Sequence, residues 1–179
     1  MPPLILLTDE TRLPDPVSAI ARLPKRAAVI VRHYGLPPHA RRALARDIAA
    51  ACRRLGHICL IANDAALARA VRADGVHWPE HAARRGRPQG LRFITAAAHD
   101  ETAIRRAQTA GADAVLVSPV FETASHPDAT PLGVLRLAAL VRGAAVPVYA
   151  LGGVTQANAR RLRAAGVAGL AAIGALAAG

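Results

Sequence analysis

The 179-residue sequence is 53% hydrophobic, enough to bury one sizeable core, and we expect a single domain over residues 1–179. Its formal net charge is +11, but aromatic residues make up only 3% of the chain, so little is available to stack on bases and we expect no nucleic-acid partner. No uncharged stretch reaches the roughly 20 apolar residues of a membrane span and no export signal opens the chain, so we expect no membrane association and a cytoplasmic protein.

Eight apolar runs recur along the chain, and each predicts a β-strand. Most runs are continuous rather than alternating, which is typical of strands buried on both faces of a parallel sheet. The predicted strands are Leu4–Asp9, Ala27–His33, His57–Asn63, Gly75–Trp78, Arg92–Ala98, Ala114–Val120, Val146–Gly152 and Gly169–Gly174.

Helical patterns separate these runs. Asp64 and Thr155 are expected N-caps, because their side chains can accept a hydrogen bond from the first turn, and Gly56 is an expected stop. The helices predicted at 14–23 and 80–86 are short, and the last helix, after the eighth strand, is nearly missing.

The strand-then-helix order predicts an α/β fold, a single compact (β/α)₈ TIM barrel, with a doubly wound sheet as the alternative. A chain of 179 residues would make a small barrel, below the usual ~200 residues. The small-residue C-terminus and the missing final helix suggest that a second copy covers the barrel there, giving a homo-oligomer.

The active site of such a barrel lies at the carboxyl ends of its strands. Polar side chains follow the apolar runs at that end and are the candidate site residues: Thr8, Arg32, Asn63, Asp64, His77, His99, Ser118, Thr123, Ser125 and His126.

Glycines follow the last two predicted strands. Gly152 and Gly153 come after the seventh, and Ile173 and Gly174 end the eighth. Glycine lets a ligand approach the backbone, and free amides here, with the N-terminus of the next helix, would bind a phosphate without a side-chain cation. The alternative is a tight turn with close packing around small residues.

Several segments together resemble one family. "LLTD", "ADGVH", "GADAVLVSPVF" followed by Thr123, and "ALGGV" with the Gly-rich segment after it are similar to thiamine-phosphate synthase and its thiazole tautomerase relative. The resemblance implies a (β/α)₈ barrel that holds a thiazole phosphate on the loops after strands seven and eight. In the synthase, a pyrimidine pyrophosphate ionises with Mg²⁺ help and the thiazole nitrogen attacks the resulting carbocation.

The resemblance and, for His77 and His99, the position at a strand end together assign roles. The catalytic candidates are Arg32, Asn63, Asp64, His99 and His126; the substrate-binding candidates are Thr8, His77, Ser118, Thr123 and Ser125. Asp64 is the candidate Mg²⁺ ligand. The site would be weakened, because Ala82 stands where the second metal carboxylate is expected, with Glu80 as a substitute, and the lysines of the pyrophosphate loops are absent.

Other interpretations stay open. A barrel that has lost catalysis could bind or sense a phosphorylated thiamine-pathway metabolite, and Ser118 and Pro119 replace the tautomerase histidine, leaving acid–base work to His99 or His126. Structural roles compete as well: Asp64 as a helix cap, and His77 as a hydrogen-bonded core histidine. Arginines on helix faces, such as Arg41 and Arg42, are expected to be solvated.

Overall fold

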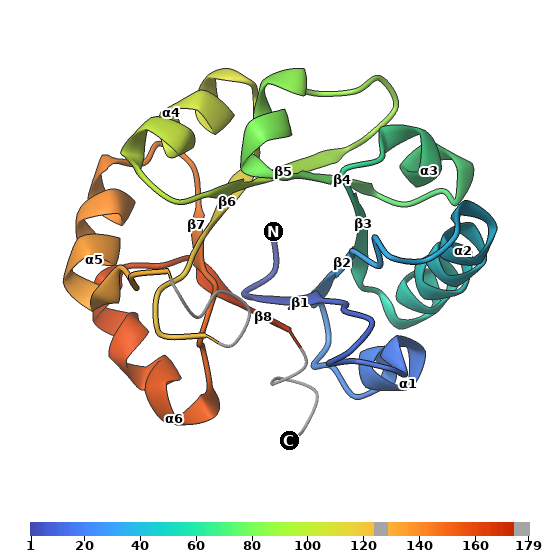
Figure 1. Ribbon diagram of the computed structural model, residues 1–179, viewed down its shortest axis with the longest axis horizontal. Helices are drawn as coiled ribbons and strands as arrows, with labels where there is room; N and C mark the ends of the chain where they lie inside the picture. Colours follow the sequence, from blue (N-terminus) through green and yellow to red (C-terminus); the bar gives the residue numbers. More distant parts are fainter. Residues whose placement is uncertain (124–128, 174–179) are drawn as a thin grey trace.

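The chain folds into a closed barrel of eight parallel strands surrounded by helices (Figure 1). This computed structural model describes residues 1–123 and 129–173. Each strand pairs in parallel with the next, and β8 pairs with β1 to close the ring. The predicted TIM barrel is therefore confirmed, and the doubly wound alternative is wrong.

All eight predicted strands are present. Five of them (β1, β2, β3, β6 and β7) end one to three residues earlier than predicted, because the predicted ranges include residues of the carboxyl-end loops, and β4 and β5 end where predicted. Their bounds are β1 Leu4–Leu7, β2 Ala28–Val31, β3 Ile58–Ala62, β4 Gly75–Trp78, β5 Phe93–Ala98, β6 Ala114–Val117, β7 Val148–Ala150 and β8 Gly169–Ile173.

The helices alternate with the strands and, as predicted, several are short. They are α1 Pro16–Ala21, α2 Pro38–Leu55, α3 Ala65–Ala70, the 3₁₀ turn η1 Glu80–Arg85, α4 Glu101–Thr109, α5 Gly133–Gly143, α6 Gln156–Ala159 and the 3₁₀ turn η2 Arg160–Ala165. The nearly missing last helix concerns residues 174–179, outside those described. Over the described ranges, no helix is both long enough and apolar enough for a membrane crossing.

Local signals fix where the helices begin and end. Asp64 caps α3 by accepting a hydrogen bond from the Leu67 backbone N–H at 2.8 Å, as predicted. Gly56 ends α2 in the left-handed conformation, with φ at 72°, which is also as predicted. Asp64 thus lies in the loop after β3, at the carboxyl edge of the barrel where the site is built, whereas Gly56 leads into the amino end of β3.

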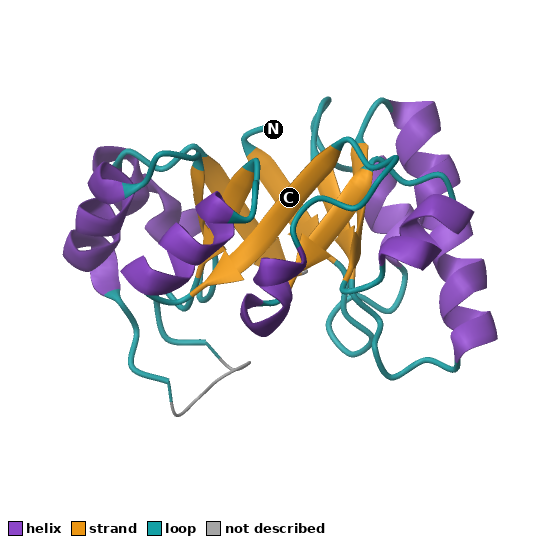
Figure 2. Cartoon of the chain, turned by 90° about the horizontal axis from the view of Figure 1, so that it is seen from above, coloured by secondary structure: helices purple, strands orange, loops and turns teal. Residues whose placement is uncertain are grey.

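Two apolar layers explain why the strands read as continuous hydrophobic runs. Alternate strand residues, such as Ile5 and Leu7 in β1, fill the barrel interior, whereas Leu6 between them packs outward against the helices. Figure 2 shows the strands enclosed between helices on both sides.

The N-terminal segment covers the amino ends of the strands. The Tyr149 hydroxyl donates to the carbonyl of Pro2 at 2.9 Å, and the Leu170 N–H donates to the carbonyl of Pro3 at the same distance. The opposite, carboxyl end carries the cavity described below.

Candidate functional site

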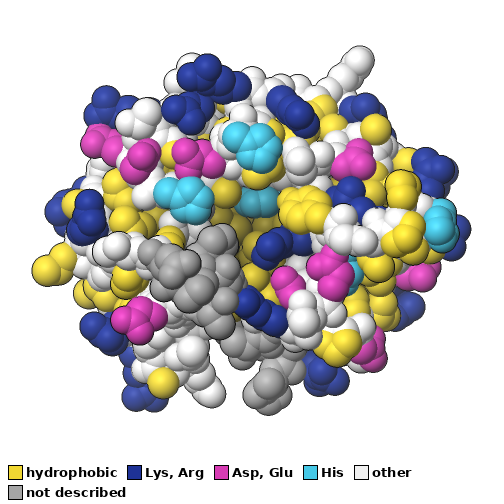
Figure 3. Space-filling model, viewed as in Figure 1, with side chains coloured by type: hydrophobic (Ala, Val, Ile, Leu, Met, Phe, Trp, Pro, Cys, Tyr) yellow, Lys and Arg dark blue, Asp and Glu magenta, His cyan; other side chains and the backbone are white. Residues whose placement is uncertain are grey.

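A cavity of about 590 Å³ opens at the carboxyl ends of the strands. Its walls come mainly from the segments after β6, β7 and β8, with basic side chains added from the β1 and β2 side. Its lining includes Arg12, Arg32, His99, Ser118, Thr123, Gly152, Gly153 and Ile173. Figure 3 looks onto this face and shows Lys, Arg and His side chains, with Asp and Glu among them, around its middle. The lining of the cavity carries two arginines and His99 against one carboxylate, Glu122, and its size suits a small ligand.

The cavity brings together seven of the candidate site residues. They are Arg32, His99, Ser118, Thr123, Gly152, Gly153 and Ile173. Four other candidates, Thr8, Asn63, Asp64 and His77, do not line it. Ser125, His126 and Gly174 lie outside the described residues, so their assigned roles stay predictions.

The loop that holds the two glycines after β7, here the glycine loop, lines the cavity. Gly152 and Gly153 have φ values of 89° and 65°, in the left-handed region that favours glycine. Their carbonyls are used inside the protein: the Phe121 N–H donates to Gly152 at 3.0 Å, and the Asn158 side-chain amide donates to Gly153 at 2.7 Å. In the described part of the chain, no acceptor takes the N–H groups of these two glycines. Two backbone donors are thus left to a ligand.

The helix after this loop adds less than the sequence suggested. α6 is only four residues long and continues as the 3₁₀ turn η2. Its capping box uses the backbone N–H groups of Thr155 and Asn158, each bonded to the other residue's side chain. Thr155 is the N-cap, as predicted. Because the capping box uses the N–H of Asn158, that donor of the helix start is not left to an anion.

Arg32 extends into the cavity from the end of β2. Its backbone is held on both sides, because its N–H donates to the Thr8 hydroxyl at 3.1 Å and its carbonyl accepts from Arg41 Nε at 3.2 Å. Among the described residues, none forms a hydrogen bond or ion pair with its guanidinium. A fixed backbone with an uncommitted cation is the arrangement that a clamp for an anion requires.

Thr8, by contrast, lies beneath the site. It is fully buried, and its hydroxyl is 2.9 Å from His33 Nδ1 in addition to accepting from Arg32. The structure therefore gives Thr8 the task of positioning Arg32, and direct contact with a substrate stays a prediction.

His99 presents one ring nitrogen to its surroundings. Its Nδ1 is hydrogen-bonded to the Ser118 carbonyl, and because a carbonyl can only accept, Nδ1 carries the proton. Its Nε2 lies 3.8 Å from Glu80 Oε2, and the side chain is 54% exposed. A neutral His99 can thus accept a proton or hydrogen bond through Nε2 at the cavity wall.

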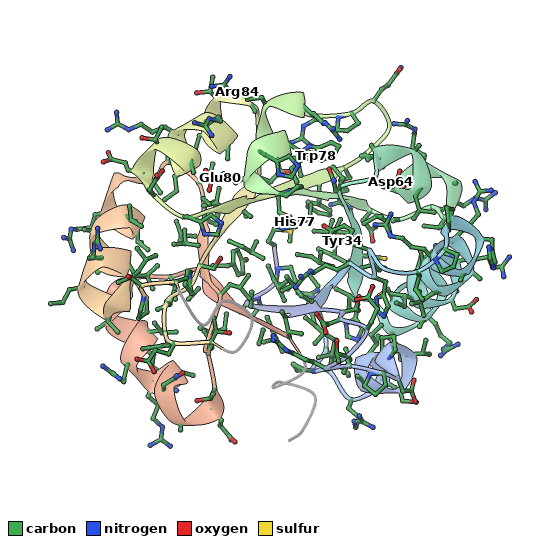
Figure 4. The ribbon with its side chains drawn as sticks, viewed as in Figure 1. Tyr34, Asp64, His77, Trp78, Glu80 and Arg84 are labelled. Atoms are coloured by element: carbon green, nitrogen blue, oxygen red, sulfur yellow. The ribbon has the colours of Figure 1, made fainter. Side chains whose placement is uncertain are left out.

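Asp64 lies away from the cavity and is already occupied. While Oδ1 caps α3, Oδ2 is paired with Arg41 Nη1 at 3.4 Å. In Figure 4, Asp64 and Tyr34 lie on the β2–β3 side, and Glu80 lies across Trp78 from them. Asn63, which precedes Asp64 in the sequence, accepts a hydrogen bond from Arg85 through its side-chain oxygen at 3.3 Å. The cap role of Asp64 is confirmed, and it uses one of the oxygens that a metal would need.

The expectation that Arg41 is solvated is wrong. Its side chain is only 14% exposed, and it donates to the Ala62 carbonyl at 2.7 Å as well as to Arg32 and Asp64. Helical periodicity placed it on the outer face of α2, but the first turn of that helix lies over the ends of β2 and β3, so the long side chain reaches inward. Arg42 is exposed, as expected.

The described residues do not fit a magnesium site around Asp64. Magnesium requires oxygen ligands in near-octahedral geometry, commonly one or two carboxylates plus waters. Here the carboxylate is paired with a guanidinium, and Ala82 supplies no donor. The substitute, Glu80, is 3.8 Å from both His99 and Arg106. Within residues 1–123 and 129–173, no group of three His, Cys, Asp or Glu side chains is placed to hold a metal ion.

His77 is a buried structural histidine in this fold. It is 6% exposed, and Nδ1 is 2.9 Å from the Thr95 hydroxyl inside the barrel. Burial, with a smaller effect of the nearby Arg32 charge, lowers the pKa of His77 from 6.5 to about 4. The ring is therefore neutral at physiological pH and cannot contribute a positive charge to anion binding.

This depressed pKa predicts a pH-dependent stability. In the unfolded chain His77 is protonated below about pH 6.5, whereas in the native protein it stays neutral until about pH 4. Because the unfolded state binds more protons between these values, the free energy of unfolding falls as the pH decreases from 6.5 to 4. The expected loss approaches about 3 kcal/mol at pH 4. Urea unfolding of the wild type and His77→Gln between pH 4 and 7 measures it, with exposed His39→Gln as the control. Parallel pH profiles for the wild type and His77→Gln would contradict the prediction.

Sequence reasoning missed two arginines of this region. Arg12 lines the cavity from the loop after β1, and Arg41 spans the β2 and β3 ends. The sign that could have found Arg12 is its position in "TDETR", close behind a strand end. For Arg41 the sequence carries no comparable sign, because its inward reach depends on how α2 sits against the barrel.

Comparisons with known proteins agree with this geometry. Residues 5–176 match the protein-family model for thiamine monophosphate synthase. The chain is 34% identical over 177 residues to a thiamine-phosphate synthase of Thiobacillus denitrificans, covering 96% of this chain and 80% of the relative. It is 37% identical over 141 residues to that of Geobacillus thermodenitrificans, covering 75% of this chain and 63% of the relative.

A solved structure, the thiamine phosphate pyrophosphorylase from Pyrococcus furiosus, superposes with a TM-score of 0.83 at 25% identity. The superposition covers 98% of this chain and 87% of that one.

Proposed function

The chain belongs to the thiamine monophosphate synthase family, a family of thiamine biosynthesis, and on this basis we propose that it forms thiamine phosphate from a thiazole phosphate and a pyrimidine pyrophosphate. The observation that carries the proposal is one cavity that combines the uncommitted Arg32 guanidinium with the free N–H groups of Gly152 and Gly153. Two anion-binding elements in one pocket suit a reaction between two phosphorylated substrates.

The thiazole phosphate binds at the glycine loop in this proposal. The amides of Gly152 and Gly153 donate to the phosphate oxygens, and Ile173 and Thr123 border the same space. Backbone donors fix the phosphate without a lysine, so the thiazole ring is held towards the middle of the barrel mouth.

The pyrophosphate group lies towards Arg32. In the reaction, the C–O bond to pyrophosphate breaks, both bonding electrons leave with the pyrophosphate, and the thiazole nitrogen supplies the pair for the new C–N bond. Arg32 offsets the charge that develops on the leaving group, and Arg12 adds positive charge to the same wall. This bond exchange needs no proton transfer. The role proposed for His99 is therefore to orient a substrate by accepting a hydrogen bond at Nε2.

We also propose that the chain acts as one domain in the cytoplasm on small phosphorylated heterocycles, without a nucleic-acid or membrane partner.

A second copy of the chain is proposed to cover the groove of about 830 Å³ beside β8, whose wall includes Leu162, Val167 and Leu170. Size-exclusion chromatography with light scattering distinguishes a dimer from a monomer.

The activity test supplies the purified chain with thiazole phosphate and pyrimidine pyrophosphate, with and without Mg²⁺. We expect thiamine phosphate and equimolar inorganic pyrophosphate, detected by mass spectrometry and a coupled phosphate assay. A thiamine-phosphate synthase of a relative is the positive control. No product where that control turns over would refute the synthase proposal, and calorimetry with thiazole phosphate would then show whether binding remains.

A further inference from the structure

An arginine crosses the carboxyl ends of β2 and β3 where the family resemblance implies a metal ion. Arg41, from the first turn of α2, donates to the Arg32 carbonyl at 3.2 Å and the Ala62 carbonyl at 2.7 Å. Its Nη1 lies 3.4 Å from Asp64 Oδ2. Three acceptors on two strand ends hold one guanidinium, and the 14% exposure of the side chain shows that it is enclosed by protein.

This contact gives the Asp64 carboxylate its counter-ion. One oxygen accepts from the Leu67 N–H at 2.8 Å and the other faces Arg41. A divalent cation would have to displace the guanidinium from Oδ2 or bind within a few ångströms of it. Either route is opposed by the repulsion between like charges in a partly buried place.

The neighbouring donors are committed as well. The Asn63 side-chain oxygen accepts from Arg85 at 3.3 Å, and Glu80 faces His99 and Arg106. Because no group of three metal-ligating side chains forms within the described residues, a cation at this place would depend on Asp64, with waters completing its coordination.

We propose that Arg41 is a built-in cation, which takes the place beside Asp64 that a divalent metal ion would otherwise occupy. This rests on the proposed function only for its consequence, which is that the pyrophosphate-bearing substrate binds as a metal-free anion. Of the five N–H donors of the Arg41 guanidinium, three are used within the described residues, so two are left for an anion. Through its bond to the Arg32 carbonyl, Arg41 also holds the backbone of Arg32, whose side chain lines the cavity.

The test is a titration with Mn²⁺ alone, followed by electron paramagnetic resonance of the free ion. The variants are Arg41→Gln, the double variant Arg41→Gln with Asp64→Asn, and Arg41→Lys, which keeps the charge. Arg42→Gln is the matched control, because it removes the same charge from an exposed neighbour on the same helical turn.

We expect no saturable Mn²⁺ binding by the wild type, Arg42→Gln or Arg41→Lys. Arg41→Gln should show saturable Mn²⁺ binding, with a dissociation constant at least about tenfold below the highest Mn²⁺ concentration at which the wild type shows none, because a repelling charge is removed and a carboxylate oxygen is released. The added Asp64→Asn should abolish this gain. Circular dichroism establishes that each variant is folded.

Two results would overturn the proposal. One is saturable Mn²⁺ binding by the wild type that Asp64→Asn abolishes, and this arm holds even if Arg41→Gln does not fold. The other is a folded Arg41→Gln with the same Mn²⁺ binding as the wild type. Neither result involves turnover, so the failure of this inference is separate from the failure of the synthase proposal.

Discussion

Replacing Gly153 with alanine is expected to lower the free energy of unfolding by about 3 kcal/mol, the sum of a conformational and a steric cost. The left-handed backbone at φ 65° costs a residue with a Cβ about 1–2 kcal/mol. The new Cβ would also lie 2.3 Å from the Glu122 carbonyl oxygen and 2.7 Å from Phe121 Cβ, in the loop after β6. Overpacking of this kind costs roughly 1–3 kcal/mol, and a backbone oxygen cannot turn aside as a side chain would.

Gly56→Ala is the matched control for this prediction. Gly56 has a similar φ of 72°, but no atom lies within 4 Å of the position that an alanine Cβ would take there. Only the conformational cost of about 1–2 kcal/mol is expected at this residue. Urea unfolding of both variants isolates the contact between the loops after β6 and β7, and equal losses at the two positions would show that this contact is not tight.

Gly153→Ala should also weaken ligand binding. The hydrogen bonds Val120 N–H to Leu151 and Phe121 N–H to Gly152, both 3.0 Å, join these two loops. Pushing the loops apart moves the amides that the thiazole phosphate is proposed to meet. Calorimetry at a temperature where the variant is folded should show weaker binding of thiazole phosphate, whereas Gly56→Ala should bind it as the wild type does.

Arg32→Gln is expected to reduce kcat/KM for thiamine phosphate formation by a factor on the order of 10², because the leaving pyrophosphate loses the positive charge proposed to offset its own. By transition-state arithmetic this corresponds to about 2.7 kcal/mol. Stability should change little, since the Arg32 contacts are made by its backbone and not by its guanidinium. Initial rates with each substrate varied in turn provide the measurement.

Two further variants define what this loss means. Arg32→Lys keeps the charge and should recover part of the rate, although a lysine cannot reproduce two-pronged hydrogen bonding to a phosphate. Arg42→Gln removes the same charge from an exposed position and should keep a rate within about twofold of the wild type. If Arg32→Gln stayed within that same range, Arg32 would not be part of the catalytic wall.

The fold could be predicted from the sequence because its signals are local and repeated. Continuous apolar runs mark strands buried on both faces, and the observed alternation of Ile5, Leu6 and Leu7 between two apolar layers is the reason. Caps such as Asp64 and stops such as Gly56 follow from single side chains or from glycine geometry. Several predicted strand ends, by contrast, fall too late, because the predicted ranges take in polar loop residues such as Thr8, Arg32 and Ser118.

The site could be predicted only in part. The glycine loop and Arg32 lie directly at strand ends, so topology alone brings them to one cavity. Thr8 and His77 also lie at strand ends, yet their hydrogen bonds to His33 and Thr95 turn them into the core.

The cases of Arg41 and α6 depend on tertiary geometry. Periodicity alone predicts a solvated arginine on a helix face, but this helix lies over two strand ends, where carbonyls and a carboxylate accept from the side chain. A helix start is expected to bind an anion, but α6 is only four residues long and its capping box uses the N–H of Asn158 itself. Neither fact is contained in periodicity.

The place of the cavity on the ring has a consequence for unfolding. Its walls combine Arg12 and Arg32, which follow the first two strands, with Gly152 and Ile173 near the last ones, and the ring closes where β1 meets β8. A ligand that contacts both walls therefore links the loops after β1 and β2 to those after β7 and β8, across the β1–β8 pairing that closes the barrel. Occupancy should oppose opening of the entire ring, so the melting temperature should climb with each increment of ligand concentration.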